Sequence, residues 1–130
     1  MTERLLLAID VGNTNTVFAL YRERDALGQW RISTVRERTA DEYAAALTQL
    51  MALKGYSHGD VGAAVISSVV PQALTPLKSM CREFFGCTAR VVGDDLGVTI
   101  PVVVDNPREV GADRLVNAVA ASLREGRRQA

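Results

Sequence analysis

The feature that most constrains the fold is a short apolar run, Leu5–Ile9, that leads without a gap into the segment Asp10–Thr16, DVGNTNT. The run predicts a buried strand over residues 4–10. A glycine such as Gly12 lets the backbone approach a ligand closely and take up positive φ. A carboxylate such as Asp10 could hold a divalent cation. Amides, hydroxyls and backbone N–H groups suited to phosphate come from Asn13, Thr14, Asn15 and Thr16.

A simpler interpretation of the same segment is a hairpin turn between two strands. Gly-Asn is a common hairpin dipeptide, and Asn and Thr are ordinary turn residues. From the residues alone, both interpretations stay open. The two better-known phosphate motifs, the P-loop and the dinucleotide-binding G-x-G-x-x-G, do not occur in the sequence.

The charge balance bears on the possible partners. Fifteen basic and 15 acidic residues give a formal net charge of zero, whereas a nucleic-acid binder usually shows a basic excess. The short basic clusters, Arg36–Arg38 and Arg124–Arg128, are expected on solvated faces. No apolar run reaches the length needed to span a membrane. We therefore expect neither a nucleic-acid nor a membrane partner.

The two cysteines and the single histidine do not indicate a disulfide or a metal site. Cys81 and Cys87, in a chain without a recognisable signal peptide, are expected to be reduced structural thiols in a cytoplasmic protein. His58 has no cysteine or histidine nearby at metal-ligand spacing, so a histidine-based metal site is not expected.

The pattern of elements predicts an α/β fold with a mixed sheet and the order β-β-β-α-β-α-β. Strands are predicted over residues 4–10, 15–21, 29–35, 61–70 and 88–92, with a charged turn at 22–26. Thr39 and Glu42 form a capping box for a first helix that ends near Gly55. A second helix is expected to bury one face and to end at Gly86; that face carries Leu74, Leu77, Cys81 and Phe84.

A second dense segment occupies residues 101–114. Asn106, Pro107 and Glu109 resemble a helix start, with Asn106 as the N-cap. That interpretation leaves Gly111 unexplained, because a glycine inside a helix costs about 1 kcal/mol relative to alanine. The alternative is a ligand site in which Asp113, ionised at a helix N-terminus, acts as a general base and Arg114 binds a carboxylate or phosphate.

Three blocks together resemble the type III pantothenate kinase family, also called the Bvg accessory factor family. They are Asp10–Thr16 after the first strand, Ser67–Pro71 in mid-chain, and Asp105–Arg114 followed by Val116-Asn117-Ala118. The blocks stand in the family's order and approximate spacing, and the resemblance covers essentially the whole chain.

The resemblance implies an actin-like, ribonuclease-H-like ATPase fold. Residues 1–105 would form the first domain and residues 106–130 the start of the second, with the substrate motif and a dimer helix. The implied reaction is ATP-dependent phosphorylation of pantothenate to 4′-phosphopantothenate, the first step of coenzyme A synthesis. By this resemblance the chain works as a homodimer through the apolar stripe Leu115–Leu123.

The resemblance also implies roles for individual residues. The loop that binds ATP phosphates would comprise Asp10, Val11, Gly12, Asn13, Thr14, Asn15, Thr16 and Val17, with Asp10 also holding Mg²⁺. Asp113 would be the catalytic base. The pantothenate pocket would be lined by Gly111, Ala112, Asp113 and Arg114. A monovalent cation, K⁺ or NH₄⁺, would be bound by a residue beyond this chain.

Two departures from the family pattern accompany the resemblance. Val104 stands where many relatives have a tyrosine that contacts substrate. Family members also continue for about another domain, so we expect this chain to be an amino-terminal half that is inactive, or nearly so, by itself. The alternatives are a non-catalytic regulatory or assembly module with a kinase-like fold, and another kinase of the actin-like superfamily.

Overall fold

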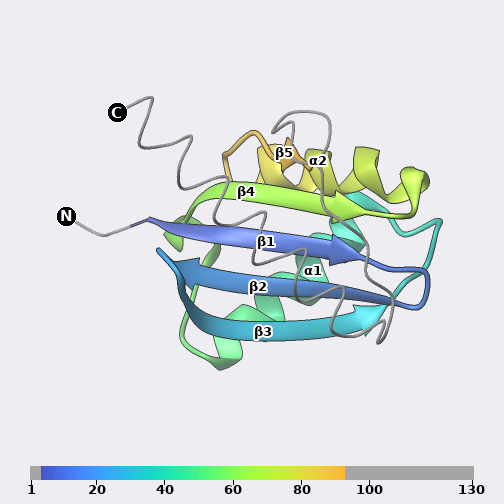
Figure 1. Ribbon diagram of the computed structural model, residues 1–130. Coiled ribbons are helices and arrows are strands. Elements are labelled where there is room, and N and C mark those ends of the chain that lie inside the picture. The colour runs from blue at the N-terminus through green and yellow to red at the C-terminus, as the bar shows by residue number, and fades with distance from the viewer. Residues whose placement is uncertain (1–3, 93–130) are drawn as a thin grey trace.

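The computed structural model describes residues 4–92 of the chain, and within them a five-stranded sheet in the order β3-β2-β1-β4-β5 (Figure 1). The strands are β1 (Leu5–Val11), β2 (Asn15–Arg22), β3 (Asp25–Ser33), β4 (Val61–Ser68) and β5 (Arg90–Val91). The helices are α1 (Ala40–Leu53) and α2 (Leu74–Phe84), with single 3₁₀ turns η1 (His58–Asp60) and η2 (Pro71–Ala73). The predicted order of elements is confirmed.

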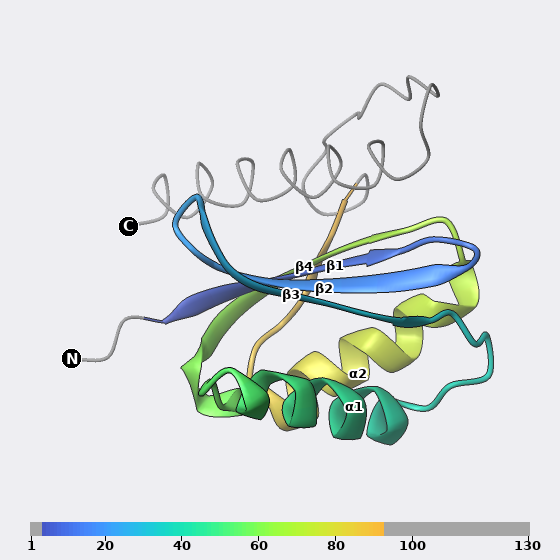
Figure 2. The same cartoon turned by 90° about the horizontal axis from the view of Figure 1, so that it is seen from below.

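The sheet is mixed. β1 pairs antiparallel with β2, and β2 antiparallel with β3, whereas β1 pairs parallel with β4 and β4 parallel with β5. Short turns suffice between antiparallel neighbours, but the parallel neighbours need a longer crossover. Here α1 and α2 supply those crossovers, and Figure 2 shows both helices on the same face of the sheet.

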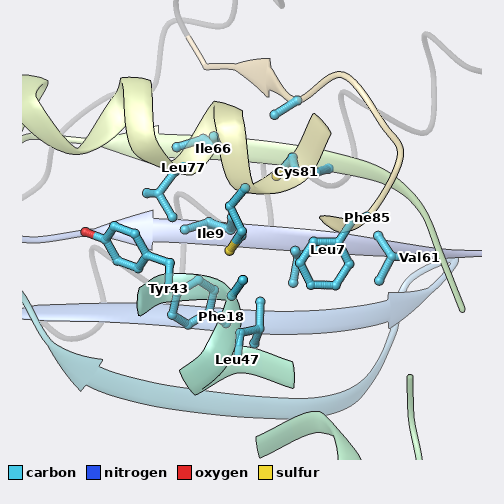
Figure 3. Close-up of a cluster of buried hydrophobic side chains, with 14 of the residues drawn as sticks. Leu7, Ile9, Phe18, Tyr43, Leu47, Val61, Ile66, Leu77, Cys81 and Phe85 are labelled. Carbon is cyan, nitrogen blue, oxygen red and sulfur yellow. The ribbon is translucent and has the colours of Figure 1, made fainter. Parts of the chain in front are cut away.

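The main core lies between that face and the two helices (Figure 3). Because strand side chains alternate between faces, the odd-numbered residues of β1 point to the helices. The largest fully buried side chains there include Leu7, Ile9, Phe18, Leu20, Tyr43, Leu47, Ile66 and Leu77. The Phe18 and Tyr43 rings pack edge to face, with centroids 6.4 Å apart, an arrangement aromatic pairs favour.

A smaller cluster lies on the opposite face of the sheet. Leu6, Ala8 and Val65 are buried there, and half-buried side chains pack against them, Tyr21 among them. Burial raises the pKa of the Tyr21 hydroxyl, since the charged form is disfavoured away from water. The face opposite the helices therefore also carries apolar contacts.

The local signals in the sequence set the boundaries of α1. The hydroxyl of Thr39 accepts the Glu42 N–H at 3.2 Å, and the Glu42 carboxylate accepts the Thr39 N–H at 2.9 Å, which is the predicted capping box. At the other end Gly55 follows the C-cap, and the Tyr56 N–H donates back to the carbonyl of Met51 at 3.0 Å. Both predicted ends of α1 are confirmed.

Several details of the prediction are wrong. β3 spans Asp25–Ser33 rather than residues 29–35, because the turn from β2 uses only Glu23 and Arg24. β5 spans Arg90–Val91 rather than residues 88–92. β4 ends at Ser68 rather than Val70. At the end of α2, Phe84 is 39% exposed and Phe85 is the buried ring. Within residues 4–92, neither helix has the length and apolar character required to span a bilayer.

Candidate functional site

The candidate site lies at one edge of the sheet. β1 and β4 are parallel, and β3, two antiparallel steps from β1, runs in the same direction. Their carboxyl ends therefore meet at one edge, beside the turn from β1 to β2 (Figure 1). Ligands of open α/β sheets commonly bind outside the carboxyl ends of strands.

Asp10 lies at this edge on the face opposite the helices. Its neighbours Ile9 and Val11 point into the main core, so the alternation of side chains turns Asp10 the other way. In the register of the sheet Asp10 stands opposite Val17 on β2 and Ser67 on β4. Asp10 is 5% exposed and Ser67 is 6% exposed. A buried carboxylate and a buried hydroxyl therefore share one row across two parallel strands.

The turn from β1 to β2 presents a short polar tip. The Gly12 N–H donates to the carbonyl of Asn15 at 2.9 Å, which closes the turn. Asn13, Thr14 and Asn15 are exposed. Their amide and hydroxyl groups are available to a ligand that approaches this edge.

Gly12 is needed for a different reason from the one predicted. Among the described residues only Gly55 and Gly86 are glycines with positive φ, so the positive φ expected at Gly12 does not occur. A Cβ at Gly12 would instead lie 3.3 Å from the Asn15 carbonyl oxygen. The constraint is the close approach of the backbone within the turn itself.

Thr34, the first residue after β3, holds this turn from the neighbouring strand. Its N–H donates to the carbonyl of Thr14 at 2.8 Å, and its hydroxyl donates to the carbonyl of Gly12, also at 2.8 Å. Its hydroxyl oxygen also lies 2.9 Å from that of Thr16, within hydrogen-bond distance. Sequence reasoning missed Thr34. Knowledge of the register between β2 and β3, which puts Ser33 opposite Asn15, would have revealed it.

The end of β4 is fastened to the same edge. The Val69 N–H donates to the carbonyl of Val11 at 3.0 Å, which extends the parallel pairing beyond Ser68. The Ser68 hydroxyl accepts the Val70 N–H at 2.9 Å and lies 2.8 Å from the Val70 carbonyl, to which it donates. The side chain of Val69 is 49% exposed. The mid-chain block that resembles the kinase family thus lies directly beside the turn.

The predicted phosphate-loop residues differ in what they present to a ligand. Asp10, Asn13, Thr14 and Asn15 place polar side chains at the edge. Val11 and Thr16 are fully buried and lie on the helix-covered side, where the Thr16 hydroxyl is hydrogen-bonded to Thr34. Val17 is half-buried opposite Asp10. Because the side chains of Val11 and Thr16 are buried, these two residues could contact a ligand only through their backbone groups.

The predicted substrate residues lie outside the described part of the chain. These are Gly111, Ala112, Asp113 and Arg114. The expected domain boundary after residue 105 and the apolar stripe Leu115–Leu123 also lie outside it. The roles assigned to residues 111–114 stay predictions.

A Mg²⁺ ion fits the donor set at the edge. Mg²⁺ in phosphate-transfer sites is commonly bound by one or two carboxylates, together with phosphate oxygens and water. Asp10 provides one carboxylate and Ser67 a neighbouring hydroxyl oxygen. No group of three or more His, Cys, Asp or Glu side chains suited to a metal occurs within residues 4–92. Among the described residues at this edge, Asp10 and Ser67 are therefore the candidate protein ligands for Mg²⁺.

Solved structures with a similar fold come from proteins of different kinds. A chain of the PilM–PilN type IV pilus biogenesis complex superposes with a TM-score of 0.54 at 14% identity, over 92% of this chain and 44% of that one. T. thermophilus RuvC, solved with a Holliday junction substrate, superposes with a TM-score of 0.51 at 17% identity, over 95% and 97%. At such low identity the likeness concerns the fold alone, and it agrees with the expected actin-like, ribonuclease-H-like class.

Sequence relatives are much closer. The type III pantothenate kinase of Rhodospirillum centenum is 55% identical over 118 residues, which cover 90% of this chain and 45% of the relative. That of Sphingopyxis alaskensis is 52% identical over 122 residues, which cover 93% and 47%. The chain thus spans about half the length of these curated relatives. The family described as type III pantothenate kinase matches residues 6–130, and the chain belongs to the type III pantothenate kinase family.

Proposed function

We propose that this chain supplies the nucleotide-phosphate edge of a kinase that transfers the γ-phosphate of ATP to pantothenate, the first step of coenzyme A synthesis. The observation that carries the proposal is the pairing of the buried Asp10 carboxylate with a polar turn fixed by Thr34 at the same edge. The family membership of residues 6–130 supports the substrate assignment.

The residues at the edge have different roles in phosphate binding. The tip formed by Asn13, Thr14 and Asn15 donates hydrogen bonds to phosphate oxygens. Asp10 would hold Mg²⁺, and the bound ion would neutralise part of the charge on the phosphates. Because phosphoryl transfer depends on positioning and charge stabilisation rather than covalent chemistry, a turn held rigidly by Thr34 is suited to the reaction.

The acceptor side of the reaction rests on the family resemblance. Asp113 would take the proton from the pantothenate hydroxyl, and Gly111, Ala112 and Arg114 would line the pantothenate pocket. A K⁺ or NH₄⁺ ion would be held outside this chain. These roles extend the proposal to residues beyond the described part of the chain.

Calorimetric titration of the chain with ATP, with and without Mg²⁺, tests the nucleotide half of the proposal. We expect Asp10→Asn to weaken the Mg²⁺-dependent component of binding by about tenfold or more, corresponding to about 1.4 kcal/mol. Binding measured with EDTA present should change little. Asp25→Asn is the matched control, because Asp25 is exposed and begins β3 at the opposite edge of the sheet.

The outcome separates the proposal from its alternatives. If the wild-type chain binds neither MgATP nor pantothenate, a non-catalytic assembly module with a kinase-like fold becomes the better interpretation. If it binds MgATP but an acceptor other than pantothenate, a different kinase of the actin-like superfamily is favoured. A steady-state assay with ATP, Mg²⁺, K⁺ or NH₄⁺ and pantothenate then tests whether this chain turns over by itself.

Self-association and a cytoplasmic location belong to the same proposal. The apolar stripe Leu115–Leu123 would join two copies of the chain. Sedimentation over a range of concentrations tests this directly. A strictly monomeric species at high concentration would contradict it.

A further inference from the structure

The end of α2 brings two cysteines together at the edge of the sheet opposite the β1–β2 turn. α2 returns from the carboxyl end of β4 to the start of the parallel strand β5, so its last turn lies at the far edge. Gly86, with φ of +67°, reverses the chain there. The carbonyl of Cys81 then accepts two N–H groups, from Phe85 and from Cys87, both at 3.1 Å.

The two thiols differ in their surroundings. Both are free. Cys81 is fully buried in the main core (Figure 3), and Cys87 is half-buried and packs against the same core. Cys87 is therefore the residue of the pair that is partly accessible to solvent, while Cys81 is shielded.

The proximity of the thiols decides which of them carries charge. A hydrogen bond between the side chains raises the pKa of Cys81, with burial adding to the effect, and lowers the pKa of Cys87. The proton is thus retained on Cys81, and Cys87 is the one that ionises. Because the thiolate is the reactive form of cysteine, the more accessible thiol is also the more nucleophilic.

We propose that Cys81 and Cys87 are an oxidisable pair, which hydrogen peroxide or another small hydroperoxide converts into an intramolecular disulfide. The Cys87 sulfur attacks the peroxide, the O–O bond breaks, and Cys87 becomes a sulfenic acid as water or an alcohol leaves. The Cys81 sulfur then displaces the hydroxyl group of that sulfenic acid. The Cys81 proton leaves with the hydroxyl as water. Two thiols are oxidised and one peroxide is reduced.

The backbone contact between the two cysteines favours closure of the pair. The hydrogen bond from Cys87 N–H to the Cys81 carbonyl already fixes the two backbones side by side. A disulfide requires the sulfurs to come within about 2 Å of each other, and we assign that movement to Cys87, which is half-buried, rather than to Cys81, which is fully buried in the core. The disulfide would tie the end of α2 to the connection that leads into β5.

The test is treatment of the reduced chain with a small excess of hydrogen peroxide, followed by thiol titration under denaturing conditions and peptide mapping without reductant. We expect both thiols to be lost together, a cross-linked peptide containing Cys81 and Cys87 to form, and dithiothreitol to reverse the change. In Cys81→Ser, Cys87 should stop at a sulfenic acid that dimedone traps. In Cys87→Ser, Cys81 should stay a thiol.

Two results would overturn the proposal. One is a wild-type chain in which both thiols survive the peroxide that oxidises the same chain unfolded in guanidinium. The other is Cys87 oxidised to the sulfinic acid while Cys81 remains free. Because each readout is chemical and lies far from the β1–β2 turn, neither depends on whether the chain binds nucleotide.

Discussion

The two faces of the sheet are formed by the same strands, but one face packs the apolar core and the other carries polar residues of the candidate site. On the helix-covered face, Ile9 and its neighbours Phe18 and Ile66 are completely buried in an apolar core. On the opposite face, the next residue of β1 is Asp10, in register with Ser67. All seven residues of β1 are buried, so burial alone does not distinguish residues that pack the core from residues of the candidate site. The alternation of side chains between the two faces distinguishes them.

The largest expected effect tests this division on two adjacent residues. Ile9→Ala should lower the free energy of unfolding by about 3–4 kcal/mol, because it leaves a cavity in the main core. Asp10→Asn should cost much less stability while it removes the proposed cation ligand. Urea unfolding measures both. Leu53→Ala, at a side chain that is 83% exposed, is the control and should stay within about 0.5 kcal/mol of wild type. Equal losses for Ile9→Ala and Asp10→Asn would contradict the division.

Thr34 links the helix-covered side of the sheet to the β1–β2 turn, and its hydroxyl can be removed without changing the shape of the side chain. Thr34→Val loses the hydrogen bond to the Gly12 carbonyl and the one shared with Thr16, at a cost of about 1–2 kcal/mol. Amide exchange of residues 12–16 should accelerate more than exchange in α1. Thr34→Ser keeps the hydroxyl and should restore slow exchange. If the serine variant behaves like the valine variant, the role assigned to the hydroxyl is wrong.

The cap of α1 should act on the helix-covered face alone. Thr39→Ala removes the acceptor for the Glu42 N–H and should cost about 1 kcal/mol. Since α1 packs only against that face, amide exchange of the β1–β2 turn should be unchanged. Ser57→Ala, which alters the shorter turn η1, is a useful comparison. Faster exchange at residues 12–16 in Thr39→Ala would show that the two faces are coupled.

The smallest effect is the pH dependence of the same cap. The pKa of Glu42 is lowered, first by the backbone hydrogen bond from Thr39 and then by the side-chain contact with Thr39. A depressed pKa in the folded state adds stability that is present above the unfolded pKa of the group and is lost as the pH falls through the folded value. The stability difference between wild type and Glu42→Ala should therefore shrink in acid. A constant difference from neutral pH to strong acid would contradict this account.

Local signals in the sequence predicted most of the fold. The capping box of α1, the glycines that end both helices and the apolar runs of β1 and β4 each depend on residues close together in the chain. The start of β3 was missed because its first residue, Asp25, is charged and follows a charged turn that contains Glu23, whose φ of 54° is unusual for a residue other than glycine. Phe84 and Phe85 follow Cys81 at spacings of three and four, so both fit a helical stripe, and the sequence does not choose between them.

The candidate site was predictable in part. Asp10 and the polar turn follow from the strand that precedes them and from the family resemblance. Thr34 lies 18 residues from Thr16 and 22 from Gly12 along the chain, and only the strand register brings them together. The buried positions of Val11 and Thr16 also require the register, because polarity alone does not say which face a strand residue occupies.

The pairing of β1 with β4 has a consequence for the order in which the molecule assembles. β1, β2 and β3 are joined by short turns, whereas β2, β3 and α1 all separate β1 from β4 in the chain. Contacts distant in sequence form more slowly than local ones. We therefore expect the three-stranded meander to form first, with its polar turn already closed. The hydrogen bond from Val69 to Val11 would come late, so a chain emerging from the ribosome would complete this contact beside the β1–β2 turn only after β4 had been made.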